Sequence, residues 1–135
     1  MQNQTVANRY VNDGAGVVPQ PRLLIMLYDR LVLDLEQADT AMTANNIAVA
    51  NDKLLHAQSI LFELQSALDR EAWSGADNLG QLYLWFNTEL ANANIKKDPK
   101  AVRVCLRLIR QLQQAWHGAY ESILAEQATA ASSAQ

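Results

Sequence analysis

The sequence has one cysteine, five glycines and three prolines among its 135 residues. A single cysteine cannot form a disulfide within the chain, which excludes a disulfide-stapled fold. So little glycine and proline also excludes a collagen-like or turn-rich β protein. The longest apolar run, Leu23 to Tyr28, is far shorter than the ~20 residues of a membrane-spanning helix, so no membrane insertion is expected.

The charge balance is slightly acidic, with 11 basic and 14 acidic residues and a net charge of -3. This balance gives no indication of a nucleic-acid partner. The polar segment from Met1 to Tyr10 lacks the apolar core of a signal peptide, which predicts a cytoplasmic location. Half of the residues are hydrophobic, and the length fits one compact domain.

Apolar residues recur with helical spacing in four stretches. The first helix is predicted from about Pro21 to Met42 and the second from an Asn46 cap to about Asp69. The third is predicted from a capping box at Ser74–Asp77 to near Ile95, and the fourth begins at Asp98–Pro99. Short links between amphipathic helices favour an all-α, antiparallel up-down four-helix bundle over residues 20–126. Residues 1–19 are expected to form a flexible amino-terminal arm, and residues 127–135 a disordered tail.

Each helix has a predicted core stripe whose members are spaced by three or four residues. The stripes contain Leu24, Tyr28, Leu31, Leu35, Ala38 and Met42; Ala50, Leu54, Ala57, Leu61, Leu64 and Leu68; Leu79, Leu82, Phe86, Leu90 and Ala93; and Val102, Cys105, Ile109, Leu112, Trp116, Ala119 and Ile123.

Three helices carry further apolar residues that point away from these stripes. They are Met26 and Leu33, Leu55 and Phe62, and Leu84, Ala91 and Ile95. Two interpretations are open, because isolated surface leucines are common and helix packing can bury such residues after all. The alternative is that these residues form apolar surface seams that bind an amphipathic partner, in the helix-in-groove mode.

The outer face of the fourth helix is basic, with Lys100, Arg103, Arg107 and Arg110. The simpler interpretation is a solvated face opposite the acidic remainder of the bundle. The alternative is contact with an acidic partner or an anionic ligand.

No catalytic, cofactor-binding or metal-binding pattern is present. The Glu-x-x-His step of a di-iron bundle is missing, since Lys53 precedes His56 and Gln114 precedes His117 at that spacing. Cys105 lies on a core stripe and is interpreted as a small buried apolar residue. A phosphotransfer role for His56 is a further alternative, but Ser59 and Ile60 stand where such domains have lysine and glycine.

The residues on these helices resemble the FliS family of flagellar secretion chaperones. The resemblance lies in Leu23–Asp29, which ends in Met-Leu-Tyr-Asp, and in a closing Leu-x-x-Ala-Trp at Leu112, Ala115 and Trp116. Tyr10 corresponds to the family's amino-terminal tyrosine, while Arg30 replaces the glycine that the family usually has after Tyr-Asp.

This resemblance implies a cytoplasmic, non-enzymatic export chaperone without cofactors. Such chaperones bind the disordered carboxy-terminal segment of flagellin, prevent premature polymerisation, and deliver flagellin to the export gate protein FlhA of the flagellar type III export apparatus. It also implies that Tyr10 covers an apolar groove until flagellin arrives. We expect a monomer or weak homodimer, and the alternative function is a homo-oligomeric helical adaptor or scaffold.

Overall fold

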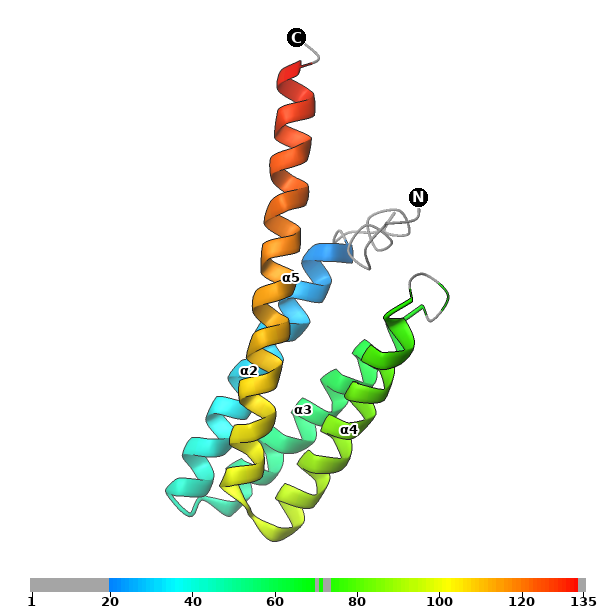
Figure 1. Ribbon diagram of the computed structural model, residues 1–135. Coiled ribbons are helices and arrows are strands. Elements are labelled where there is room, and N and C mark those ends of the chain that lie inside the picture. Colours follow the sequence, from blue (N-terminus) through cyan, green and yellow to red (C-terminus); the bar gives the residue numbers. More distant parts are fainter. Residues whose placement is uncertain (1–19, 70, 72–73, 134–135) are drawn as a thin grey trace.

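The structure is a computed structural model that describes residues 20–69, 71 and 74–133. This part contains four α-helices: α2 (Gln20–Thr43), α3 (Ile47–Ala67), α4 (Ala76–Lys96) and α5 (Pro99–Ser133). Consecutive helices run in opposite directions, which confirms the predicted all-α up-down bundle (Figure 1). The expected arm, residues 1–19 with Tyr10, lies outside the described residues.

Two of the three predicted helix starts are confirmed by their caps. The side chain of Asn46 accepts a hydrogen bond from the amide of Val49 at 3.4 Å, and Asp98 accepts one from the amide of Lys100 at 3.0 Å. These bonds satisfy amides that have no partner within the helix. The predicted capping box at Ser74–Asp77 is wrong, because α4 begins one residue later and Gly75, which has no side-chain acceptor, occupies the cap position.

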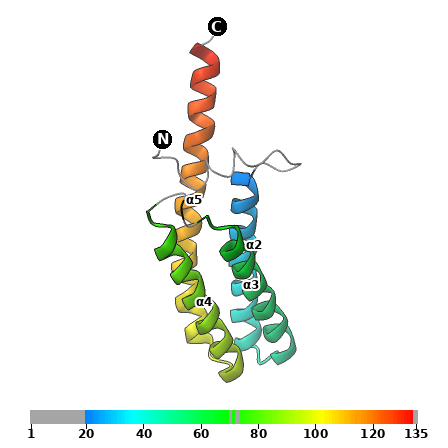
Figure 2. The ribbon, with the colours of Figure 1, turned by 90° about the vertical axis from the view of Figure 1, so that its right-hand side faces the viewer.

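Helix α5 is longer than the sequence pattern predicts. It continues to Ser133 and rises past the ends of the other helices (Figure 2). Residues 127–133, expected to belong to a disordered tail, are therefore helical. Ala128, Ala130 and Ala131 explain the difference, since alanine has the highest helix propensity and a helix needs no apolar contact to continue through it.

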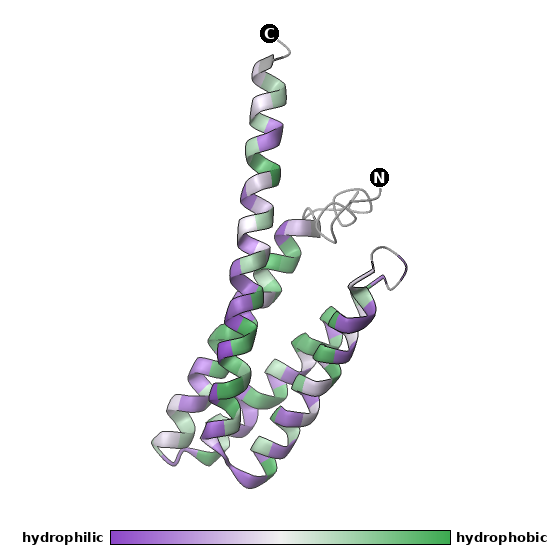
Figure 3. Cartoon of the chain, in the orientation of Figure 1, coloured by the Kyte–Doolittle hydropathy of each residue, from purple (hydrophilic) through white to green (hydrophobic). Residues whose placement is uncertain are grey.

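The helices form a closed ring, in which each contacts its neighbours in sequence and α5 returns to α2. The predicted stripes supply most of the large fully buried side chains, among them Tyr28, Leu61, Phe86 and Ile109. Figure 3 shows hydrophobic stretches where the helices run alongside one another and mixed colouring on the last turns of α5.

The buried core includes residues outside the predicted stripes, and some stripe members are only partly buried. Ile25, Val32, Ile60, Tyr83 and Leu106 are also buried, because each helix packs against two neighbours and so buries a wider face. The members that are only partly buried include Met42, Leu68, Leu82, Leu112 and Trp116.

Candidate functional site

The apolar residues predicted to lie outside the core are on the surface. Phe62 is 68% exposed, Leu55 52% and Ile95 81%. Met26, Leu33 and Leu84 are exposed as well, and Ala91 is partly buried. Helical geometry therefore placed these side chains correctly, and their role in binding a partner stays a prediction.

Further large apolar side chains are exposed that the heptad pattern does not indicate. They are Ile47, Val49, Trp85, Val104 and Leu124. None of them is seven residues from a second large exposed apolar residue, so a search for pairs with heptad spacing does not find them. Their positions on a helical wheel relative to the core stripe are the signal that would identify them.

Two open grooves lie along the seam between α2 and α3. The upper groove, beside the start of α2, has a volume of about 520 Å³ and is lined by Leu23, Leu27, Phe62, Glu63, Ser66 and Ala67. The lower groove, beside the turn between the helices, has a volume of about 470 Å³ and is lined by Leu33, Glu36, Gln37, Thr40, Ala41, Ala44, Asn46, Val49 and Lys53. The exposed Phe62 thus borders one groove, and the exposed Leu33 borders the other.

A polar cluster lies between the two grooves. The Asp34 side chain is fully buried, and His56 of α3 places its Nδ1 within hydrogen-bond distance of Asp34 Oδ2. The Nε atom of Arg30, one turn earlier on α2, lies 3.2 Å from Asp34 Oδ1. His56 is on the surface, as expected, and its ring contacts the buried carboxylate of Asp34 through Nδ1. This contact between α2 and α3 has no signal in the sequence, since the two residues are 22 positions apart.

The motifs that carry the family resemblance meet inside the bundle. The hydroxyl groups of Tyr28 and Tyr83 are 2.7 Å apart, and the Tyr28 ring lies 6.3 Å from that of Trp116 between centroids. The neighbouring Asp29 accepts hydrogen bonds from Gln113 and His117 of α5 at 2.9 and 2.8 Å. The Tyr-Asp pair therefore joins α2 to α4 and α5, which is a structural role.

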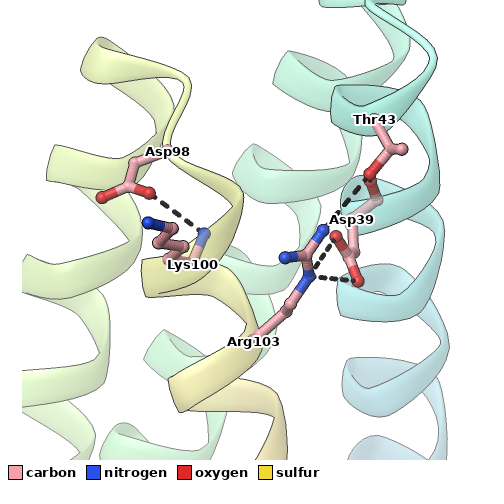
Figure 4. Close-up of polar contacts among 5 residues, drawn as sticks. All are labelled: Asp39, Thr43, Asp98, Lys100 and Arg103. Carbon is pink, nitrogen blue, oxygen red and sulfur yellow. Dashed lines mark hydrogen bonds and ion pairs between the residues drawn. The ribbon is translucent and has the colours of Figure 1, made fainter.

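The basic face of α5 is divided between internal ion pairs and solvent. Arg103 contacts Asp39 at 3.0 Å and the Thr43 hydroxyl at 3.4 Å (Figure 4), and Arg110 pairs with Glu36. Lys100 and Arg107 are exposed, and within the described part of the chain no carboxylate lies at ion-pair distance from either. Two of the four basic residues, Arg103 and Arg110, therefore link α5 to α2.

The described residues hold no group of three or more His, Cys, Asp or Glu side chains arranged to bind a metal ion. Burial raises the pKa of the Cys105 thiol to about 12, and the nearby Glu89 carboxylate contributes to the rise. The thiol is therefore protonated at neutral pH. In the part that the structure describes, no helix has both the length and the apolar character required to span a bilayer.

Comparison with known proteins gives a consistent match. A family model described as "Flagellar protein FliS" matches residues 1–123. The flagellar secretion chaperone FliS of Vibrio cholerae serotype O1 is 32% identical over 96 residues, which covers 70% of this chain and 71% of the relative. The flagellar secretion chaperone FliS of Bacillus subtilis strain 168 is 25% identical over 122 residues, with 90% and 91% covered. The family match ends inside α5, before its last ten described residues, 124–133.

Proposed function

The chain belongs to the FliS family of flagellar chaperones, and on that premise we propose that it binds the disordered carboxy-terminal segment of flagellin in the cytoplasm. By covering the apolar stripes of that segment, it prevents premature polymerisation. It then delivers flagellin to the flagellar type III export apparatus, where FlhA is the proposed receptor.

The observation that supports this function best is the apolar surface along the seam between α2 and α3. Two mainly apolar grooves lie along these helices, one on each side of the polar cluster. Phe62 borders one groove, Leu33 borders the other, and both side chains are exposed. Each large side chain that a partner buries contributes ~1.5 to 3 kcal/mol. Several such contacts outweigh the cost of ordering a disordered segment, which is a few kcal/mol.

We propose a non-enzymatic role, because capture and release require only a difference in binding free energy between flagellin and the export apparatus. The arm at residues 1–19 is proposed to cover an apolar groove through Tyr10 before flagellin binds. The exposed Leu84 and Ile95 of α4, with the partly buried Ala91, are proposed as a second contact surface for a segment long enough to wrap around the bundle.

The proposal is tested by the mass of the complex in solution. The full chain, at micromolar concentration, is mixed with the carboxy-terminal segment of flagellin from the same bacterium, and light scattering is recorded during size exclusion. We expect a monomer or weak homodimer alone and a one-to-one complex with the segment. A salt-resistant oligomer whose mass the segment does not change would instead support the homo-oligomeric adaptor.

A matched control uses the same flagellin segment with its apolar residues replaced by serine. This control should leave the chaperone at its starting mass, because the proposed contact is apolar. An equal shift in mass with both segments would contradict binding through the grooves.

A further inference from the structure

The seam between α2 and α3 has a polar centre between two apolar ends. On α2 and the turn that follows it, one stripe with steps of four and three residues contains Leu23, Leu27, Arg30, Asp34, Gln37, Ala41 and Ala44. On α3, the facing stripe contains Val49, Lys53, His56, Ile60, Glu63 and Ala67. The first and last members of these stripes line the two grooves, and the cluster of Arg30, Asp34 and His56 lies between them.

We propose that this cluster, with Arg30 as its surface-facing cation, binds a carboxylate side chain of the flagellin segment, between two groups of apolar residues that occupy the grooves. The inference rests on the proposed function and adds a specificity determinant to it. Arg30 selects for an acidic residue at the centre of the bound segment.

Arg30 and His56 are the members of the cluster whose side chains reach the surface. Asp34 is fully buried, and both of its oxygens face cations or donors from the cluster itself. The Nδ1 atom of His56 lies within hydrogen-bond distance of Asp34 Oδ2. Arg30 uses Nε toward Asp34, while its side chain is 46% exposed. Among the described residues, the two terminal nitrogens of the guanidinium have no hydrogen-bond or ion-pair partner, so their N–H groups can donate to a guest.

Further charged residues line the two grooves on either side of the cluster. Lys53, three residues before His56, lines the lower groove and adds a second cation. Glu36 lines the same groove, but Arg110 of α5 already pairs with it. Glu63 lines the upper groove, beyond the cluster. The centre of the seam therefore carries the Arg30 cation beside the buried carboxylate of Asp34, and Lys53 adds positive charge at the lower groove, so this part of the seam attracts an anionic side chain.

The distance between the two grooves limits the length of the guest segment. The grooves are centred about 14 residues apart along α2, which is about 20 Å at the helical rise of 1.5 Å per residue. A helical guest would therefore carry its two apolar groups about 14 residues apart, with the acidic residue about midway. The buried Oε1 atom of Gln37 in the lower groove accepts no hydrogen bond from the described residues, so it offers an acceptor to a donor of the guest.

The test is a double-mutant cycle between Arg30→Gln and acid-to-amide substitutions in the flagellin segment. Each Asp or Glu of the segment is changed singly to Asn or Gln, and the affinity of every segment is measured by calorimetry with the full wild-type chain and with Arg30→Gln. One substitution is expected to weaken binding to the wild type about tenfold and binding to Arg30→Gln less than twofold, since a charge-assisted hydrogen bond is lost only in the first case. Arg30→Lys should restore part of the difference.

Arg107→Gln is the matched control, because it removes the same charge from an exposed site on α5. It should keep the full tenfold effect of the critical acid. If wild-type protein binds the segment but every acid-to-amide effect persists in Arg30→Gln, the carboxylate site is refuted while the proposed function stands. If the wild type does not bind the segment at all, the proposed function fails, and this inference fails with it.

Discussion

At the scale of single residues, Cys105 shows how burial lowers the reactivity of a side chain. The side chain is fully buried on α5, and its thiol pKa is raised to about 12 by desolvation and by the nearby Glu89 carboxylate. A raised pKa keeps the thiol protonated from neutral pH up to well above pH 9, whereas an unfolded cysteine ionises near pH 8.5. The thiolate is the nucleophile, so the folded state suppresses alkylation.

We therefore expect Cys105 to resist iodoacetamide in the native chain at pH 8.5. In denaturant, where the thiol is exposed and has an ordinary pKa, labelling should go to completion under the same conditions. Mass spectrometry of quenched samples measures both. Native labelling at a rate within about threefold of the unfolded rate would contradict the burial of this thiol.

At the scale of elements, α3 has two apolar faces with different roles. Leu61 belongs to the core stripe and is fully buried, while Leu55, six residues earlier, is 52% exposed. Both are leucines on the same helix, so a comparison between them separates the effect of burial from that of helix propensity.

Leu61→Asp is expected to abolish the cooperative thermal unfolding transition, since it places an unpaired charge in the core and removes a large apolar contact. Leu55→Asp should leave helicity intact and shift the melting midpoint by no more than about 3 °C. Circular dichroism measures both variants. A folded Leu61→Asp variant with a normal midpoint would mean that the core face of α3 is assigned wrongly.

The sequence predicts a feature well when the residues that determine it lie close together in the chain. The four helices, their core stripes and the caps at Asn46 and Asp98 follow from spacing and capping chemistry within a few residues. The extension of α5 was missed because its last turns have no core contact and depend on alanine propensity alone. The bridge from Asp34 to His56 and the two grooves arise from the packing of α2 on α3, and single-helix periodicity contains no information about that contact.

The last turns of α5 provide a prediction of their own. Residues 124–132 are all exposed, so they bury little against the bundle. Removing residues 127–135 should lower the helical signal but change the melting midpoint by less than about 2 °C. A larger loss, measured by circular dichroism, would show that this segment stabilises the bundle.

At the scale of the whole molecule, the two seams of α2 are chemically different. Facing α5, α2 uses Asp29, Glu36 and Asp39, which contact His117, Arg110 and Arg103 at steps of seven residues along α5. These exposed pairs contribute little stability individually, but their spacing favours one register of α5 on α2. Facing α3, α2 instead leaves open grooves. Charged pairs therefore join α2 to α5 on one side of the molecule, whereas the α2–α3 side is open to a partner.

The central claim is that the apolar surface of the α2–α3 side binds flagellin, and the most direct measurement of it is the affinity of the double variant Leu55→Asp/Phe62→Asp for the carboxy-terminal segment of flagellin. We expect Kd to rise at least tenfold, about 1.4 kcal/mol, with an unchanged melting midpoint. The matched control is Leu124→Asp, at an exposed leucine of α5 that lies beyond the family match. It should bind like the wild type. An unchanged Kd in the double variant would contradict the account.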